Sequence, residues 1–356
     1  MIKLVHTLTL LGFYEEFFEE PYIRNARSFF KERSDKYCNE LKKSPQEFLQ
    51  HWAKLAEAEE ERAYAVLQHG SWEAAERAAE DAFVGERVKW LAEDGLRQLF
   101  AQRSDNGDIA IDTLRNLYDI LLRTEGRDLL RAEWSAYLTR QVITIVEGDA
   151  AVMIDGLLEL HGFAGRVVRD AFRELNIAGS RRDVFSHGLD DAFERGFQAR
   201  GKEVAVQIAK YIDTKLRSST KTLSEEARDA LLDSVLLLFR YTADKDVFRT
   251  FYTRALARRL LRGNTADNDA EKRVIQKLMR EYDPDFEKGL EMFKDLELSQ
   301  ELLDGFLEKM RFRGLDGDAS KMTAMVLQTT AWPIHGVVTI QLPEKVRGSS
   351  RTITWF

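Results

Sequence analysis

Aromatic and basic side chains gather in one short stretch, KDVFRTFYTRALARRLL, at residues 245–261. Its seventeen positions hold three aromatic rings and five lysine or arginine side chains. Exposed rings beside arginines can stack on nucleic-acid bases while the guanidinium groups bind phosphates. The same composition suits a helix that lies on a membrane surface. The third alternative is a buried core helix, and the placement of the rings decides among the three.

On a helix, at about 100° per residue, the stretch separates its rings from part of its charge. Arg249 and Arg254 fall on the arc opposite the rings. Burying each ring stabilises a fold by roughly 1.5–3 kcal/mol. Three rings left in water would form an exposed hydrophobic patch that favours aggregation. We therefore interpret 245–261 as a core helix rather than a nucleic-acid or membrane surface. Its apolar arc is Val247, Phe248, Phe251, Tyr252, Ala255 and Leu256.

Two arginines break this pattern, because Arg258 and Arg259 project into the same arc as the rings. A buried guanidinium is costly unless it is paired and hydrogen-bonded. Either both side chains extend past the end of the packed face, or nearby carboxylates meet them. The candidate partners are Asp267, Asp269 and Glu271, and Asp244 can cap the start of the helix. If the arc is fully buried, Phe251→Ala should cost roughly 3–5 kcal/mol.

Patterns typical of catalysis or metal binding are absent from the sequence. It has no GxGxxG, GxxxxGK[ST], GxSxG or HExxH motif, and its six histidines are dispersed. Cys38 is the only cysteine, which excludes an intrachain disulfide and a thiolate metal cluster. The 60 acidic residues are best interpreted as solvated helix faces. We expect no catalytic residue, no cofactor and no metal.

Composition favours a mainly helical protein of two or three domains. The chain has 356 residues, of which 44% are hydrophobic and only 5 are proline, so few helices must break. A net charge of −7 argues against a protein that coats nucleic acid. No stretch approaches the roughly 20 apolar residues that span a bilayer. We expect a cytoplasmic and/or nuclear protein that binds neither nucleic acid nor membrane.

Helical periodicity dominates to about residue 313, and the last residues differ. Three short segments there, 322–328, 337–342 and 352–355, are rich in Val, Ile, Thr or Trp and predict two or three strands. The predicted helices are 46–68, 76–100, 111–123, 129–146, 153–172, 183–200, 201–216, 223–242, 244–262, 269–282 and 299–313.

The stretch LLLFRYTADKDVFRTFYTRALARRLL at 236–261 resembles the signature of cullins, the elongated scaffolds of multisubunit ubiquitin ligases. Collinear blocks support the resemblance, which is nearest to cullin-4. These are LRAEWSAYLTRQVITIV, AKYIDTKLRSSTK (209–221), NDAEKRVIQKLMREY (268–282), LEMFKDLELSQEL (290–302), AWP (331–333) and SSRTITW (349–355). The structural signature residues are Asp246, Val247, Phe248, Phe251, Tyr252, Leu256, Arg258, Arg259 and Leu260.

The resemblance implies an elongated cullin-repeat array at 1–175, a four-helix-bundle-like domain at 178–320 and a short, incomplete α/β region at 321–356. In cullins that α/β region holds a RING-box protein, which adds a strand to its sheet. The corresponding side chains here are Met322, Ala324, Val326, Trp332, Val338, Ile340, Ile353 and Trp355. The implied function is a non-catalytic scaffold that supports ubiquitin-dependent protein degradation.

The sequence also departs from the family pattern, as if it were truncated at both ends. No segment corresponds to the first repeat, which binds the adaptor in cullins, so adaptor binding is not predicted. No winged helix with its modified lysine follows Phe356, and Tyr282-Asp283 stands where the family has Cys-Gly. The alternative is a cullin-like helical-repeat interaction protein without ligase function, and binding to a RING-box protein would distinguish the two.

Overall fold

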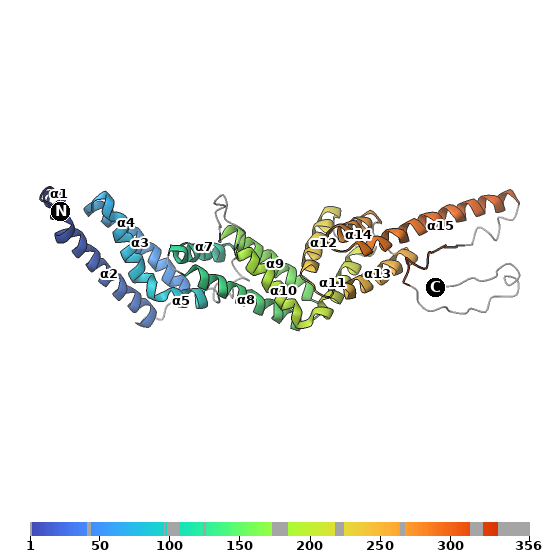
Figure 1. The fold of residues 1–356 in the computed structure, drawn as a ribbon, viewed down its shortest axis with the longest axis horizontal. Coiled ribbons are helices and arrows are strands. Elements are labelled where there is room, and N and C mark those ends of the chain that lie inside the picture. The colour runs from blue at the N-terminus through green and yellow to red at the C-terminus, as the bar shows by residue number, and fades with distance from the viewer. Residues whose placement is uncertain are drawn as a thin grey trace. The chain divides into compact units, whose positions relative to one another are not determined.

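The computed structural model describes residues 2–40, 44–95, 97, 107–123, 126–172, 184–217, 224–263, 268–313 and 323–333. The chain divides into two compact units. The first contains residues 1–147 and 159–196, and the second contains residues 148–158 and 197–356. Figure 1 shows that both units are built from helices. The three-part division implied by the family resemblance stays a prediction.

The first unit begins with three helices that share an aromatic core: α2 (Glu20–Asp35), α3 (Pro45–Val66) and α4 (Trp72–Val84). The Phe83 ring stacks on Phe48 at 4.6 Å and on Trp52 at 5.1 Å between centroids. Ser44 and Glu47 form a capping box at the start of α3, which satisfies backbone donors that a helix start leaves unpaired. Helix α1 (Ile2–Leu10) precedes this group.

The remaining helices of the first unit are α5 (Val88–Trp90), α7 (Gly107–Arg123), α8 (Arg127–Glu147), most of α9 (Met153–Asp170) and α10 (Val184–Phe197). Leucine, valine and tryptophan recur every fourth residue along α8, from Leu130 to Val146, and all are buried. At the centre of this packing, Trp134 meets the Phe172 ring edge to face at 5.2 Å. Its indole N–H donates to the Phe185 carbonyl, so the ring is held in one orientation.

The second unit contains α11 (Gly201–Leu216), α12 (Glu225–Arg240), α13 (Lys245–Arg262), α14 (Asn268–Glu281) and α15 (Glu287–Phe312). Helices α11 and α13 pack against each other along much of their length. Salt bridges from Arg273 to Asp229 and from Lys277 to Asp233 join α14 to α12. Helix α13 ends at Gly263, whose positive φ of 61° is the left-handed conformation that glycine adopts without a steric penalty.

The mainly helical fold class is confirmed, and three predicted elements differ. The predicted helix 299–313 is only the second half of α15, which begins at Glu287. The segment 76–100 is not one helix, because α4 ends at Val84 and short 3₁₀ and π turns follow between Gly85 and Gly95. Residues 323–328 form no strand in the structure, since a strand needs a partner and the described neighbours of this segment are helical. The other two predicted strands, 337–342 and 352–355, lie outside the described residues.

No helix in the described ranges is long and apolar enough to cross a membrane.

Candidate functional site

Helix α13 buries one face of the aromatic and basic stretch within the second unit. Phe248, Tyr252 and Leu256 are at most 1% exposed, and Leu260 extends the same face. The Phe248 ring lies 4.2 Å from the Phe239 ring of α12, between centroids. The core-helix interpretation is therefore right for this face, and its rings are not available for base stacking.

Three details of the predicted helix are wrong. The Phe251 ring is 40% exposed, because it lies at the edge of the arc where no neighbouring helix covers it fully. Arg258 is exposed, so it does not share the environment of Arg259. Asp244 occupies the N-cap position without a capping hydrogen bond from its side chain. Of the other signature residues, Val247 is half-buried and Asp246 is exposed.

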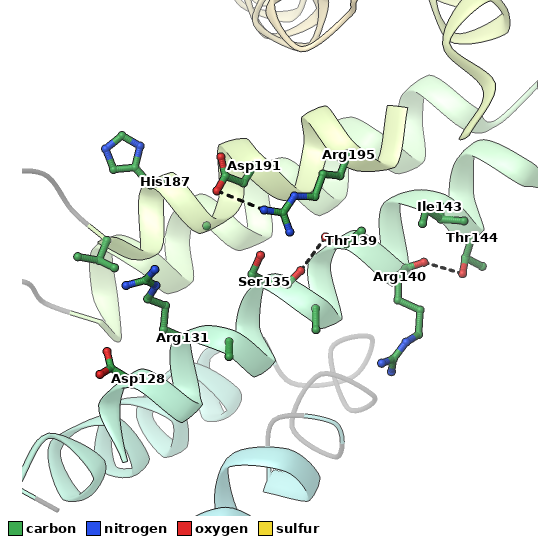
Figure 2. A pocket seen from close by; sticks show the side chains of 14 residues that line it. Asp128, Arg131, Ser135, Thr139, Arg140, Ile143, Thr144, His187, Asp191 and Arg195 are labelled. Carbon is green, nitrogen blue, oxygen red and sulfur yellow. Dashed lines mark hydrogen bonds and ion pairs between the residues drawn. The ribbon is translucent and has the colours of Figure 1, made fainter. Parts of the chain in front are cut away.

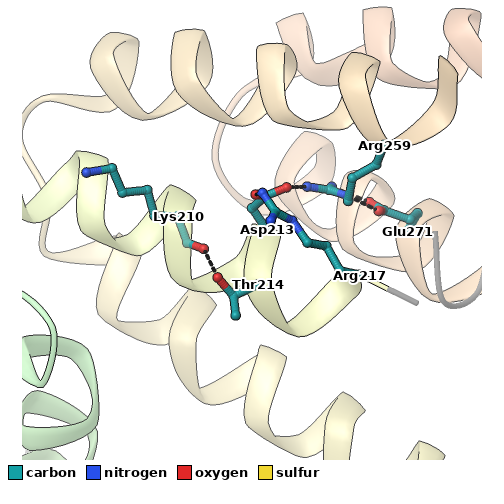
Figure 3. A network of polar contacts seen from close by, with 6 residues as sticks. All are labelled: Lys210, Asp213, Thr214, Arg217, Arg259 and Glu271. Atoms are coloured by element: carbon teal, nitrogen blue, oxygen red, sulfur yellow. Dashed lines mark hydrogen bonds and ion pairs between the residues drawn. The ribbon is translucent and has the colours of Figure 1, made fainter. Parts of the chain in front are cut away.

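Arg259 lies at the centre of a buried charge network (Figure 3). Its Nε donates to Glu271 Oε1 at 2.6 Å and its Nη2 donates to Glu271 Oε2 at 2.9 Å, so the pair is bidentate. Its Nη1 donates to Asp213 of α11, which also accepts from Arg217. Arg259 is 2% exposed and Glu271 is 0% exposed. The paired-carboxylate hypothesis is thus confirmed for Arg259, with Glu271 among the proposed partners.

Electrostatics keep Arg259 charged at this depth. Burial by itself would lower the pKa of the guanidinium, but the Glu271 carboxylate and the hydrogen bonds to Glu271 and Asp213 outweigh it, so the pKa of Arg259 is raised. Burial raises the pKa of the Tyr252 phenol well above its ordinary value, and the negative charge of the nearby Glu271 carboxylate raises it further. The network therefore fixes α11, α13 and α14 relative to one another with every charge compensated.

Tyr282 and Asp283, where the family resemblance predicts Cys-Gly, are held beside this helix by hydrogen bonds. The Tyr282 hydroxyl donates to the Leu236 carbonyl at 2.9 Å. Asp283 accepts from Arg249 of α13, and Asp285 accepts from the same guanidinium at 2.8 Å. These residues bind the loop after α14 to α13, which indicates a structural rather than a binding role.

The segment 323–333, which includes part of the predicted strand region, is fastened to α15 by two side chains. Asp295, only 2% exposed, accepts from the backbone N–H of Gln328 and from the Trp332 indole N–H, each at 2.8 Å. Ser299 Oγ accepts from the backbone N–H of Val326 at 2.8 Å and lies 3.1 Å from the Val326 carbonyl oxygen. A buried carboxylate that accepts two hydrogen bonds is satisfied, so this attachment is specific.

The attachment uses alternate residues of the segment. Val326 and Gln328 turn their backbone N–H groups toward α15. Two N–H groups two residues apart that face the same side fit an extended chain, in which successive residues turn their backbone groups to opposite sides. We infer that Met325 and Leu327 turn theirs away from the helix. We call the backbone groups of Met325 and Leu327 the free edge. This edge lies beside exposed side chains, since Met325 is 50% and Val326 55% exposed.

The predicted partner-contacting residues are found in three situations. Ala324 and Val326 are exposed on the fastened segment. Trp332 is also predicted to contact a partner, whereas its ring is 5% exposed and anchors the segment to Asp295. Met322, Val338, Ile340, Ile353 and Trp355 lie outside the described residues. In the described part of the chain, no group of three or more His, Cys, Asp or Glu side chains is arranged to hold a metal ion.

The family model of the cullin alpha solenoid domain matches residues 1–303. The chain belongs to the cullin family. Similar relatives are Cullin-4A of Mus musculus and Cullin-4A of Homo sapiens, each 28% identical over 97% of this chain. Cullin-4 of Dictyostelium discoideum is 27% identical over 96% of it. The predicted family resemblance is confirmed. This cullin spans 44% of the length of the two mammalian relatives.

Sequence reasoning missed the residues that organise the site from a distance. Asp213 lies 46 positions before Arg259 and Asp295 lies 37 positions before Trp332. In the sequence of this cullin, each of these two aspartates looks like a solvent-exposed charge on an amphipathic helix. One signal was available for Asp295, because it shares a helix face with Met292 and Ser299 at intervals of three and four residues.

Proposed function

We propose that this cullin is a non-catalytic scaffold subunit of a ubiquitin ligase complex. In this proposal, a RING-box protein adds a strand to the free edge of residues 323–328. The observation that supports it is that the Val326 and Gln328 N–H groups both face α15, from which we infer that the backbone groups of Met325 and Leu327 are directed away from it. An extended segment with an unused edge is a template for strand addition.

The fastening to α15 favours this mode of binding. Fixing a flexible backbone costs roughly 1–2 kcal/mol per residue, and a segment already fixed avoids part of that cost on binding. Asp295, Ser299 and the buried Trp332 supply the fixed geometry. Exposed Met325 and Val326 side chains add apolar contact area for the incoming chain.

A scaffold needs a rigid fold rather than catalytic residues. The buried network of Arg259, Glu271 and Asp213 joins three helices of the unit that also carries the fastened segment. We expect the complex to act in the cytoplasm and/or nucleus, in ubiquitin-dependent protein degradation. A second candidate function is that of a helical-repeat interaction protein without ligase function. The helices of both units could provide its partner-binding surface equally well.

Co-expression with a tagged RING-box protein tests the proposal. The full chain should co-purify with it, and Met325→Pro should reduce the retained amount at least about tenfold because proline lacks the N–H that strand pairing needs. Proline also favours an extended residue before it, so the segment should keep its course. Met325→Ala is the matched control, since it shortens the side chain and keeps the N–H.

Equal retention of the Met325→Pro and Met325→Ala variants would contradict strand addition at this edge. Failure of the unmodified chain to retain the RING-box protein would favour the helical-repeat interaction protein without ligase function.

A further inference from the structure

A hollow of about 1160 Å³ runs along the seam between α8 and α10, within the first unit. Its α8 side follows two rows of residues spaced by four, from Asp128 to Thr144, and its α10 side runs from Val184 to Arg195. At 1.5 Å per residue, the α8 rows extend over about 24 Å. The hollow is therefore a groove, long enough for about four turns of another helix. We call it the α8–α10 groove.

Small side chains give this groove its floor. Gly188 brings α10 close to α8, because a Cβ at this position would lie 3.5 Å from Trp134 Cδ1 and 3.9 Å from Ser135 Cβ. Beside that contact, α8 presents Ala132, Ala136 and Thr139 to the groove. Small residues therefore make up the middle of the seam, where an incoming backbone could approach closely, and the longer arginine side chains border it.

Arginines from both helices border the floor. In Figure 2, Arg131 from α8 and Arg195 from α10 both reach into the space between the two helices. Arg140 lines the same groove farther along α8. Arg195 has only a 3.9 Å contact with Asp191, and both side chains are more than half exposed, so this pair contributes little. Neither Arg131 nor Arg140 forms an ion pair with a described residue.

We propose that the α8–α10 groove is a docking site for an acidic helical segment of a partner protein. Small side chains of that helix would lie on the floor, and its carboxylates would bind Arg131, Arg195 and Arg140. Guanidinium–carboxylate hydrogen bonds are directional and among the stronger polar contacts at an interface. The surface lies in the first unit, so it is distinct from the free edge at 323–328.

The remaining lining residues favour a protein helix over the other polyanions. No phenylalanine, tyrosine or tryptophan lines the groove, and the His187 ring points away from the space between the two helices in Figure 2, so single-stranded nucleic acid would find little stacking surface there. Asp128 and Asp191 share the walls with the arginines and would repel a continuous phosphate backbone. A helix with spaced carboxylates avoids that repulsion, and these two aspartates would set its register.

A defined probe makes the proposal testable. The probe is a fluorescein-labelled, alanine-based helical peptide of about four turns, with glutamates spaced by three and four residues along one face. Fluorescence anisotropy should show saturable binding to the full chain. The same peptide with glutamine at every glutamate position should bind at least about tenfold more weakly, which corresponds to about 1.4 kcal/mol.

Variants of the groove separate specific docking from general attraction. Arg131→Glu and Arg195→Glu should each weaken binding about tenfold, and Ala136→Trp should abolish it by filling the floor. Their controls are Arg166→Glu on α9 and Ala74→Trp on α4, both at exposed positions, which should bind as the unmodified chain does. Circular dichroism and thermal melts verify that each variant is folded.

Several results would overturn the proposal. These are equal binding of the glutamate and glutamine peptides, equal effects of Arg131→Glu and Arg166→Glu, unchanged binding by Ala136→Trp, and no anisotropy change at millimolar protein. Displacement of the peptide by a short single-stranded DNA at a lower concentration than by unlabelled peptide would assign the arginines to nucleic acid instead.

Discussion

Arg259 and Glu271 form two parallel hydrogen bonds, of 2.6 and 2.9 Å, between side chains that are 2% and 0% exposed. The guanidinium comes from α13 and the carboxylate from α14, with Asp213 of α11 completing the pairing. Charges buried this deeply are stable only together. The arrangement makes the relative position of three helices depend on a few atoms.

Removal of Arg259 should therefore be strongly destabilising. Arg259→Leu leaves the Glu271 carboxylate buried without its bidentate partner, and we expect a loss of roughly 3–5 kcal/mol in the free energy of unfolding. Urea unfolding followed by circular dichroism measures it. Arg258→Leu, one residue earlier and exposed, should change stability by less than about 0.5 kcal/mol. Similar losses for both variants would show that the network does not hold these helices.

The two phenylalanines of α13 should differ in their contribution to stability. Phe248 is fully buried against Phe239, so Phe248→Ala should cost roughly 3–5 kcal/mol. Phe251 is 40% exposed, and Phe251→Ala should cost about 1 kcal/mol. Thermal melts of the two variants measure the difference. A larger loss at Phe251 than at Phe248 would restore the expectation drawn from the helical pattern alone.

These helices show how far the sequence predicts the fold. The spacing of Phe248, Tyr252 and Leu256 correctly predicts the buried face of α13. The same spacing does not determine which edge of a wide apolar arc is covered by a neighbouring helix. Phe251 lies on the uncovered edge. Helix periodicity is a local property, whereas coverage depends on the packing of other helices.

The same limit applies to the candidate site. Glu271 is predictable as a partner of Arg259 because it lies twelve positions along the chain. Asp213 is not, since its approach depends on how α11 packs on α13. Likewise, the apolar pattern near the C-terminus predicts a strand, but the attachment of residues 323–333 to Asp295 requires a fold in which α15 lies beside them.

Asp295 should control the order of the fastened segment. Asp295→Ala removes the acceptor of the Gln328 N–H and of the Trp332 indole N–H. We expect amide hydrogen exchange at Gln328 to accelerate by at least about tenfold, since protection reflects the stability of such local bonds. Glu301→Ala on the exposed face of α15 is the control. Unchanged exchange in Asp295→Ala would mean that Ser299 and apolar packing hold the segment without it.

Tyr252 should make the protein lose stability in alkaline solution. Burial and the Glu271 carboxylate raise the pKa of its phenol well above the ordinary value of about 10. Above that ordinary value the unfolded chain releases the phenol proton and the folded chain keeps it. Stability associated with Tyr252 is therefore complete below about pH 10 and falls as the pH rises further.

Tyr252→Phe tests this dependence. The hydroxyl is buried and has no hydrogen-bond partner among the described residues, so its removal should leave neutral stability unchanged or raise it by up to about 1 kcal/mol. Between pH 9 and 11, urea unfolding should show a smaller loss of stability for this variant than for the unmodified chain. Tyr64→Phe, at a 53% exposed ring, should keep the unmodified pH dependence. Parallel curves for Tyr252→Phe and the unmodified chain would mean that the phenol ionises as readily in the folded state as in the unfolded one.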